Sequence, residues 1–183
     1  MRNMTRLFVA INFPPAVREQ LTEIIAGAKK KAREGNFTRD ENLHLTLAFI
    51  GETERLEDAK HAVEQISASC FDLTLSGFGT FKRRDGDIFW MGMEKCPPLL
   101  DIQKRLCRHL TDCGFEIDKR FTPHLTLGRH VIFQKDFDAE AFAKTVPPMT
   151  VPVERISLMK SERVNGRLIY VETASKELQK QSE

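Results

Sequence analysis

HLTLAFIG at residues 44–51 and HLTLGRHVIF at residues 124–133 begin with the same four residues, and an apolar run continues each copy. Side chains alternate between the two faces of a β-strand, so each copy should turn its histidine and threonine to one face and its two leucines to the other. Phe49 is expected on the leucine face of the first copy. The repeat therefore predicts two similar strands, each with a buried apolar face and a His-Thr pair on the opposite face.

Strands and helices follow one another in a similar order around both copies. Around the first copy we expect a strand at 7–13, a helix from Pro14-Pro15 that fades near Gly35, and a helix at 56–69. Around the second copy we expect a hairpin at 71–93 with its turn at Asp85-Gly86, helices at 97–113 and 139–143, and strands at 151–160 and 168–173. This order predicts an α+β fold with largely antiparallel sheets, in which two lobes share a central cleft if the repetition is real.

The composition is typical of one folded unit. The 183 residues are 41% hydrophobic and 30% charged, which suits a single two-lobed domain over residues 1–183, with a frayed polar tail from about residue 177. The formal net charge of +2 excludes the strongly basic surface of a protein that grips long nucleic acid, so any RNA contact should be short and local. The sequence shows no secretory apolar segment and no membrane-spanning run. We expect a cytoplasmic monomer without membrane contact.

The doubled His-Thr pair suits acid and base catalysis at phosphorus. In-line displacement needs the nucleophile and the leaving oxygen on opposite sides of phosphorus, and two histidines from opposing lobes fit that geometry. Because an imidazole has a pKa of about 6.5, His44 and His124 could act as one neutral base and one charged acid. Thr46 and Thr126 could donate hydrogen bonds to the non-bridging phosphate oxygens. A single histidine or threonine on a strand is more often structural, so it is the matched pair that favours catalysis.

The sequence carries no recognisable metal or cofactor motif. HExxH, a glycine-rich phosphate loop and a GxSxG elbow are all missing, and two distant histidines without a third ligand make a poor zinc site. Four cysteines without CxxC spacing are expected to be reduced thiols: Cys70, Cys96, Cys107 and Cys113. We therefore expect neither a metal nor a cofactor.

The residues that flank the two motifs add to the pattern. They are Leu7-Phe8-Val9-Ala10 followed by Pro14, Glu41-Asn42-Leu43, Phe49-Ile50-Gly51, Arg120-Phe121-Thr122-Pro123, and Arg129. With the doubled HxTx motif, they make nearly the whole chain resemble the two-histidine phosphoesterase superfamily, in particular the bacterial and archaeal RNA 2′,3′-cyclic phosphodiesterases, historically called 2′-5′ RNA ligases. The resemblance implies a bilobal, pseudo-symmetric fold of two sheets with flanking helices, and an active site in the central cleft.

The resemblance also implies a reaction. This is metal-independent hydrolysis of a terminal RNA 2′,3′-cyclic phosphate to a 2′-phosphomonoester, together with the related, reversible joining of RNA ends through a 2′-5′ linkage. It suggests His44 as the proton donor and His124 as the proton acceptor, although two identical motifs do not themselves assign the roles.

Two alternatives stay open. One is a phosphodiesterase that acts on small cyclic nucleotide phosphates, which the near-neutral charge of the chain permits. The other is a binding module for RNA ends or nucleotides that has no turnover. The presence of both histidines and both threonines argues against this second alternative.

Four further residues are candidates for substrate contact. Phe37, where relatives often carry a tryptophan, and Phe121 could stack on a base or pack in the core. Arg120 could neutralise a phosphate or simply solvate its loop. Arg129 could also contact phosphate, but in a regular strand it would lie on the leucine face and brace the sheet.

Overall fold

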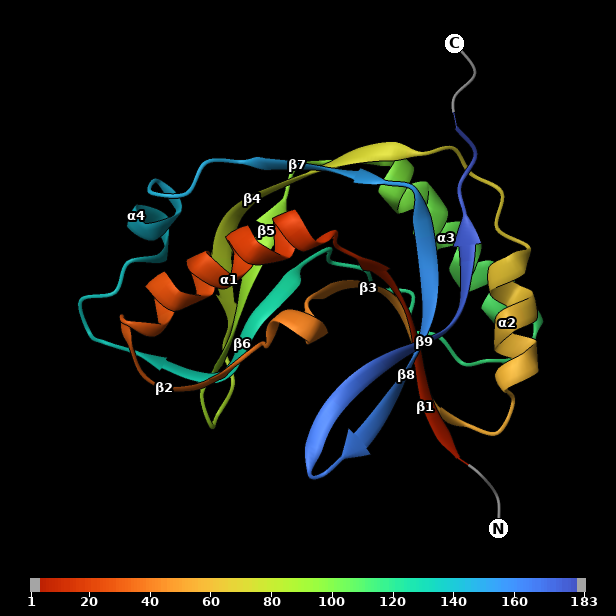
Figure 1. The fold of residues 1–183 in the computed structure, drawn as a ribbon, viewed down its shortest axis with the longest axis horizontal. Helices are drawn as coiled ribbons and strands as arrows, with labels where there is room; N and C mark the ends of the chain where they lie inside the picture. The colour runs from red at the N-terminus through yellow and green to blue at the C-terminus, as the bar shows by residue number, and fades with distance from the viewer. Residues whose placement is uncertain (1–3, 181–183) are drawn as a thin grey trace.

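Two antiparallel sheets form the framework of the protein, and the computed structural model describes residues 4–180 of it. The first sheet has the strand order β3-β1-β8-β9, with β1 at Thr5–Asn12, β3 at His44–Thr53, β8 at Arg155–Val164 and β9 at Arg167–Glu177. The second has the order β2-β6-β5-β4-β7, with β2 at Ala32–Phe37, β4 at Phe71–Phe81, β5 at Asp87–Met93, β6 at Leu125–Phe133 and β7 at Met149–Val153. The predicted α+β class and antiparallel pairing are confirmed (Figure 1).

The helices connect and flank these sheets. They are α1 at Pro15–Lys29, α2 at Leu56–Glu64, α3 at Pro97–Asp112 and α4 at Ala139–Ala143, and a 3₁₀ turn, η1, at Asp40–Asn42 precedes β3. Proline pairs begin α1 and α3 because proline presets the helical φ and its missing N–H needs no partner in the first turn. None of the helices in residues 4–180 is both long enough and apolar enough to cross a membrane.

The two halves of the molecule repeat one unit. In the first half β1 leads through α1 to β3, which pairs with β1; in the second half β5 leads through α3 to β6, which pairs with β5. Each sheet therefore contains one HLTL strand beside the strand that precedes its helix, as Figure 1 shows. The predicted two-lobed, pseudo-symmetric arrangement is confirmed.

One hydrophobic core joins the two sheets and takes in the leucines of both motifs. The exposed fraction is 0% for Leu45, 2% for Leu47 and 0% for both Leu125 and Leu127. The opposite face of the first sheet carries a separate small cluster of Phe8, Ala10 and Met159, against which Tyr170 packs. The predicted burial of the leucine faces is confirmed, and the His-Thr faces are left outside the main core.

Both HLTL strands contain a β-bulge at the second leucine. In the first sheet Thr46 pairs with Ala10 and Ala48 with Val9, so that Leu47 has no partner of its own. In the second, Thr126 pairs with Trp90 and Gly128 with Phe89, which leaves Leu127 extra in the same way. A bulge adds one residue to one strand and so shifts the alternation of the side chains that follow.

The shift moves one residue of each strand to the His-Thr face. Phe49 lies opposite Phe8 and is 57% exposed, so its predicted place on the leucine face is wrong. Arg129 follows the bulge in β6 and is likewise exposed, so its placement on the leucine face of a regular strand is also wrong. The two bulges occupy equivalent positions, which makes Phe49 and Arg129 counterparts across the pseudo-symmetry.

Several element boundaries differ from the sequence predictions. The expected tail of the first helix is instead the polar strand β2, which is held to the edge of the second sheet by β6. The single strand expected at 151–160 is two strands, β7 and β8, in different sheets. The helix at 56–69 ends at Glu64, and the strand at 168–173 extends over Arg167–Glu177.

The frayed tail predicted from about residue 177 is wrong as far as residue 180. Leu178 is buried, and Gln179 bridges to Ser69 through the backbone. The burial of Leu178 and the backbone bonds of this segment to Glu154, Ala68 and Cys70 hold it between the β7–β8 connection and the loop before β4. Residues 181–183 of the predicted tail lie outside the described residues.

Candidate active site

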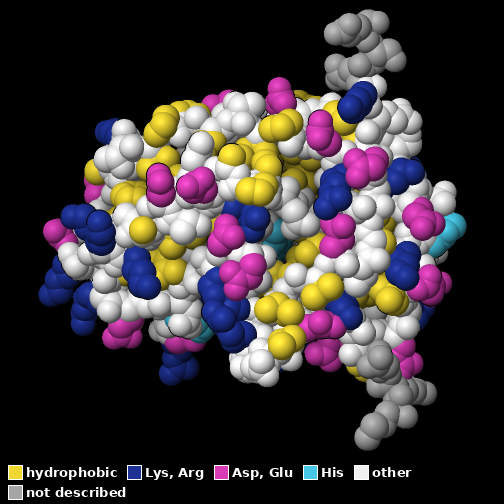
Figure 2. Space-filling model, viewed as in Figure 1, with side chains coloured by type: hydrophobic (Ala, Val, Ile, Leu, Met, Phe, Trp, Pro, Cys, Tyr) yellow, Lys and Arg dark blue, Asp and Glu magenta, His cyan; other side chains and the backbone are white. Residues whose placement is uncertain are grey.

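The two motif histidines come from different sheets and lie near one another. His44 is the first residue of β3, and His124 immediately precedes β6. Repulsion from Arg129, and from His124 when that ring is protonated, lowers the pKa of His44, as expected for side chains that lie near one another. Figure 2 shows a hollow near the middle of one face, with histidine (cyan) inside it and both basic and acidic side chains around its rim.

The hydrogen bonds of His44 fix its tautomer. Its Nδ1 lies 2.7 Å from the backbone oxygen of Asn42, and because a carbonyl only accepts, Nδ1 must carry the proton and donate it. Its Nε2 lies 3.0 Å from Oγ1 of Thr46. In the neutral ring Nε2 is then the basic nitrogen, and it accepts a hydrogen bond from the threonine hydroxyl.

His124 repeats the first of these bonds. Its Nδ1 donates to the backbone oxygen of Thr122 at 2.6 Å, again the carbonyl two residues earlier. Both rings are therefore held by the same kind of contact, which leaves Nε2 of each ring as the nitrogen that can exchange a proton. Within the described residues, His124 has no counterpart to the bond between His44 and Thr46.

Two aromatic rings bury His44. The ring of Phe8 lies 4.9 Å from the imidazole, and the ring of Tyr170 meets it edge-on at 5.1 Å. This burial is the main reason that the pKa of His44 is lowered; the bond to Asn42 acts in the opposite direction, and the charges of Arg129 and His124 lower the pKa further. In the empty protein burial therefore favours the neutral form of His44.

The β8–β9 hairpin fastens the turn that aims His44. The carbonyl of Leu168 accepts a hydrogen bond from Nδ2 of Asn42 at 3.1 Å and another from the guanidinium of Arg39. Asn42 thus holds the histidine ring with its backbone and the hairpin with its side chain. Tyr170, two residues beyond Leu168, covers the same ring. Sequence reasoning missed these contacts because they join segments far apart in the chain.

Phe81 and Trp90 border His124 in the second sheet. The Phe81 ring lies 4.9 Å from the imidazole at an angle of 88°, and the indole lies 6.4 Å from it. Trp90 pairs with Thr126 across β5 and β6, so both side chains point to the same face. Neither aromatic residue was a sequence candidate, although their alternation in β4 and β5 could have indicated them once the strand pairing was known.

The structure separates the two candidate arginines. Arg129 lies close enough to His44 for its positive charge to lower the pKa of that ring. The side chain of Arg120 is 91% exposed and bonds both oxygens of Asp118, which raises the pKa of Arg120 and lowers that of Asp118. Only Arg129 is therefore brought to the site.

The two candidate phenylalanines pack against the main core. Phe37 pairs with Gly128 on the leucine face, and a Cβ at Gly128 would lie 3.2 Å from its ring. Phe121 lies in the loop between α3 and β6 and lines a groove with Leu100, Lys104 and Cys107. These positions favour the core-packing alternative for Phe37 and place Phe121 beside α3.

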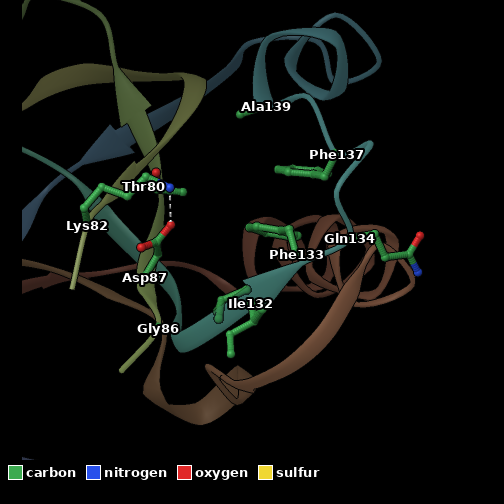
Figure 3. Close-up of a pocket in the computed structure, with 10 residues that line it drawn as sticks. Thr80, Lys82, Gly86, Asp87, Ile132, Phe133, Gln134, Phe137 and Ala139 are labelled. Atoms are coloured by element: carbon green, nitrogen blue, oxygen red, sulfur yellow. Dashed lines mark hydrogen bonds and ion pairs between the residues drawn. The ribbon is translucent and has the colours of Figure 1, made fainter. Parts of the chain in front are cut away.

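A separate cavity lies where β4 and β6 end and β5 begins. It has a volume of about 400 Å³ and is shown in Figure 3. The stacked rings of Phe133 and Phe137, 3.8 Å apart, form one wall, and an ion pair between Lys82 and Asp87 lies at another side. No motif histidine or threonine lines this cavity.

Metal ligands do not gather anywhere in residues 4–180. No three side chains among histidine, cysteine, aspartate and glutamate lie close enough there to hold a metal ion. The four cysteines are free, and burial raises the pKa of the Cys107 thiol.

Comparison with known proteins finds relatives along most of the chain. The family model described as the 2′-5′ RNA ligase superfamily matches residues 9–165. The RNA 2′,3′-cyclic phosphodiesterase of Thermotoga maritima is 32% identical over 170 residues, which are 90% of this chain and 91% of that protein. The protein of the same name from Escherichia coli is 32% identical over 178 residues, which are 93% of this chain and 94% of that protein.

Solved structures of similar proteins share the fold. Escherichia coli LigT complexed with 3′-AMP superimposes with a TM-score of 0.79 at 28% identity and covers 96% of this chain and 99% of its own. TT0787 of Thermus thermophilus gives a TM-score of 0.77 at 26% identity, with 97% and 100% covered. Because the family model spans most of the chain and its relatives share both sequence and fold, the chain belongs to the 2′-5′ RNA ligase superfamily.

Proposed function

We propose that this protein hydrolyses a terminal RNA 2′,3′-cyclic phosphate to a 2′-phosphomonoester, with His44 and His124 as the acid and the base and without a metal ion. The observation that carries the proposal is the matched pair of imidazoles, one from each sheet, each holding its Nδ1 proton on the carbonyl two residues earlier. Relatives named RNA 2′,3′-cyclic phosphodiesterase support the choice of substrate.

The reaction uses the Nε2 atoms of the two rings, because a backbone carbonyl holds Nδ1 of each. Nε2 of the base takes a proton from water, whose oxygen attacks phosphorus on the side opposite the 3′ oxygen. Nε2 of the acid gives its proton to the 3′ oxygen as the bond between phosphorus and that oxygen breaks. The phosphate then stays on the 2′ oxygen. With the 5′-hydroxyl of another RNA in place of water, the same steps would join two RNA ends through a 2′-5′ linkage. The reverse of these steps would cleave that linkage.

Three more side chains would hold the phosphate. Thr46 and Thr126 lie two residues beyond the histidines on the same faces. Thr126, and Thr46 once Nε2 of His44 is protonated and no longer accepts its hydrogen bond, can donate to the non-bridging oxygens. Arg129, brought to this face by the bulge, supplies a positive charge for the negative charge that builds up during attack. The paired bulges thus place one cation, Arg129 of β6, and one aromatic ring, Phe49 of β3, on the His-Thr faces of the two sheets.

We assign His44 as the proton donor and His124 as the proton acceptor. A donor must be protonated before the reaction, whereas burial lowers the pKa of His44 and so favours its neutral form in the empty protein. The anionic cyclic phosphate offsets the repulsion between His44 and Arg129 and so raises the pKa of His44 on binding. In this assignment His44 takes up its proton together with the substrate.

Both histidines belong to one chain and share one site, so catalysis needs no second copy. We propose a monomer that acts on RNA ends in the cytoplasm. A second candidate substrate is a small nucleotide with a 2′,3′-cyclic phosphate, which the net charge of +2 and the 3′-AMP complex of the Escherichia coli relative favour.

The two substrates can be compared directly. We would measure kcat/KM for a short RNA ending in a 2′,3′-cyclic phosphate and for the mononucleotide with the same last base. An RNA end as the substrate predicts a higher kcat/KM for the RNA. Equal or higher values for the mononucleotide would favour the small-nucleotide alternative, and binding of both without turnover would favour a binding module.

A further inference from the structure

The chain crosses from the second sheet to the first in residues 38–43. β2, which pairs with β6, ends directly before this segment, and β3 begins directly after it with His44 (Figure 1). The backbone N–H of Thr38 donates to the carbonyl of Leu127 at 2.9 Å, and the hydroxyl of Thr38 donates to the carbonyl of Thr126, also at 2.9 Å. One residue therefore bonds two successive carbonyls of the second motif, at its bulge.

The other end of this segment holds the ring of His44. The η1 turn is fastened on two sides, because Asp40 forms an ion pair with Arg18 of α1 at 2.8 Å and the side chain of Asn42 donates to β9. The carbonyl of Asn42 then accepts the Nδ1 proton of His44 at 2.7 Å. A short, anchored segment thus connects the bulge of the second motif, through Thr38, to the histidine of the first.

The second half of the chain holds the bulge of the first motif in a similar way. Nε2 of Gln103, in α3, donates to the carbonyl of Leu47 at 3.4 Å, and it also lies 3.0 Å from Sγ of Cys107. Gln103 is only 7% exposed, and within residues 4–180 it and Ser157 are the only buried polar residues. Burial of an amide in an apolar core is unfavourable unless the amide is hydrogen-bonded, so the bond to Leu47 explains why Gln103 is tolerated there.

These hydrogen bonds add precision that the core between the sheets does not supply. The leucines of both motifs pack in that core, but hydrophobic attraction is non-directional, whereas a hydrogen bond depends on both distance and angle. Proton transfer requires the acid and the base to lie within hydrogen-bond reach of the reacting atoms. A displacement of about 1 Å can lower a rate by roughly 100-fold. Directional contacts between the two halves at the motif strands therefore bear on catalysis.

From these contacts we infer that Thr38 and Gln103 are positioning residues, each of which holds the bulge of the opposite motif and so sets the separation of His44 and His124. The inference rests on the proposed function, since this separation affects the rate only if the two rings act on one phosphate. Thr38 makes the shorter bonds, and the chain leads directly from it to His44. Its hydroxyl should therefore have the larger effect.

Thr38→Val removes the hydroxyl and keeps both the shape of the side chain and the backbone N–H. With a short RNA ending in a 2′,3′-cyclic phosphate, kcat should fall by roughly 10- to 100-fold, while KM and the affinity for adenosine 2′-monophosphate stay nearly unchanged. Thr38→Ser keeps the hydroxyl and should restore most of the rate. Gln103→Met keeps the length of the side chain without the donor, and it should lower kcat by a smaller factor.

Thr173→Val is the matched control. The hydroxyl of Thr173 also donates to a strand carbonyl, that of Leu158 at 3.1 Å, but this bond lies within the first sheet. The control should lower the melting temperature about as much as Thr38→Val does and should leave kcat unchanged. An unchanged kcat in Thr38→Val, an equal loss of kcat in the control, or a loss that Thr38→Ser does not restore would overturn the inference.

A second measurement does not depend on turnover. Crystal structures of the wild-type protein and of Thr38→Val would give the distance between Nε2 of His44 and Nε2 of His124, which should change by about 1 Å, the displacement that corresponds to the expected loss of rate. Equal distances would overturn the inference even if the RNA is hydrolysed. A changed distance in a protein that hydrolyses no cyclic phosphate would support the positioning role and refute the proposed function instead.

Discussion

Arg129→Gln tests whether the bulge in β6 contributes to catalysis by placing Arg129 on the His-Thr face. The bulge turns Arg129 onto the His-Thr face, where its charge acts on His44. A hydrogen bond to a charged group contributes about 1.5–3 kcal/mol. Because the guanidinium is exposed in the empty protein, we take the lower part of this range, about 1.5–2 kcal/mol, which corresponds to a fall of roughly 10- to 30-fold in kcat/KM.

The same substitution should also shift the pH dependence. Arg129 lowers the pKa of His44, so removing its charge should raise that pKa. If His44 is the proton donor, activity is lost as the pH rises through its pKa, and the alkaline limb of the profile should move to higher pH. The assay is kcat/KM against pH, together with NMR titration of the His44 ring.

Arg120→Gln is the control for Arg129→Gln. It removes the same charge from a side chain that is 91% exposed and bound to Asp118, and we expect little change in activity or pH profile. The account is refuted if the two variants lose activity equally, or if the pKa of His44 falls in Arg129→Gln.

Further predictions follow from the same contacts. His44→Ala and His124→Ala should each lower kcat by roughly 100- to 10,000-fold, and a chelator should leave the wild-type rate unchanged; a rate restored by added metal would count against the mechanism. Tyr170→Ala uncovers the His44 ring, so the pKa of His44 in NMR titration should rise toward its ordinary value, and an unchanged pKa would show that burial by Tyr170 is unimportant. Leu127→Ala removes a fully buried side chain at the bulge and should lower the free energy of unfolding by about 2–5 kcal/mol in urea denaturation, whereas a loss below 1 kcal/mol would indicate that the site collapses around the change.

The sequence correctly predicted the features that depend only on the alternation of neighbouring side chains along a strand. His44 and Thr46 share a face, and Leu45 is buried beneath them, because neighbouring side chains on a strand point to opposite faces. The same reasoning failed two residues later. The bulge at Leu47 depends on how β3 pairs with β1, and nothing in the HLTL stretch specifies that pairing, so Phe49 was placed on the wrong face.

The rest of the site depends on contacts between distant segments. Tyr170 reaches His44, and Trp90 reaches His124, only after the strands have been ordered into sheets. β2 was missed for a similar reason, because its polar residues have little intrinsic preference for a strand and are held there by pairing with β6. Phe37, a candidate because it precedes the first motif in the sequence, packs against the main core instead.

The most direct test of the central claim is the position of the phosphate in the product. The purified protein, His44→Ala and His124→Ala would each be incubated, in the presence of a chelator, with a short RNA ending in a 2′,3′-cyclic phosphate, and the 2′- and 3′-phosphate products would be resolved. The account predicts a 2′-phosphate that only the wild-type protein forms at an appreciable rate. A 3′-phosphate, or undiminished product from either histidine variant, would contradict it.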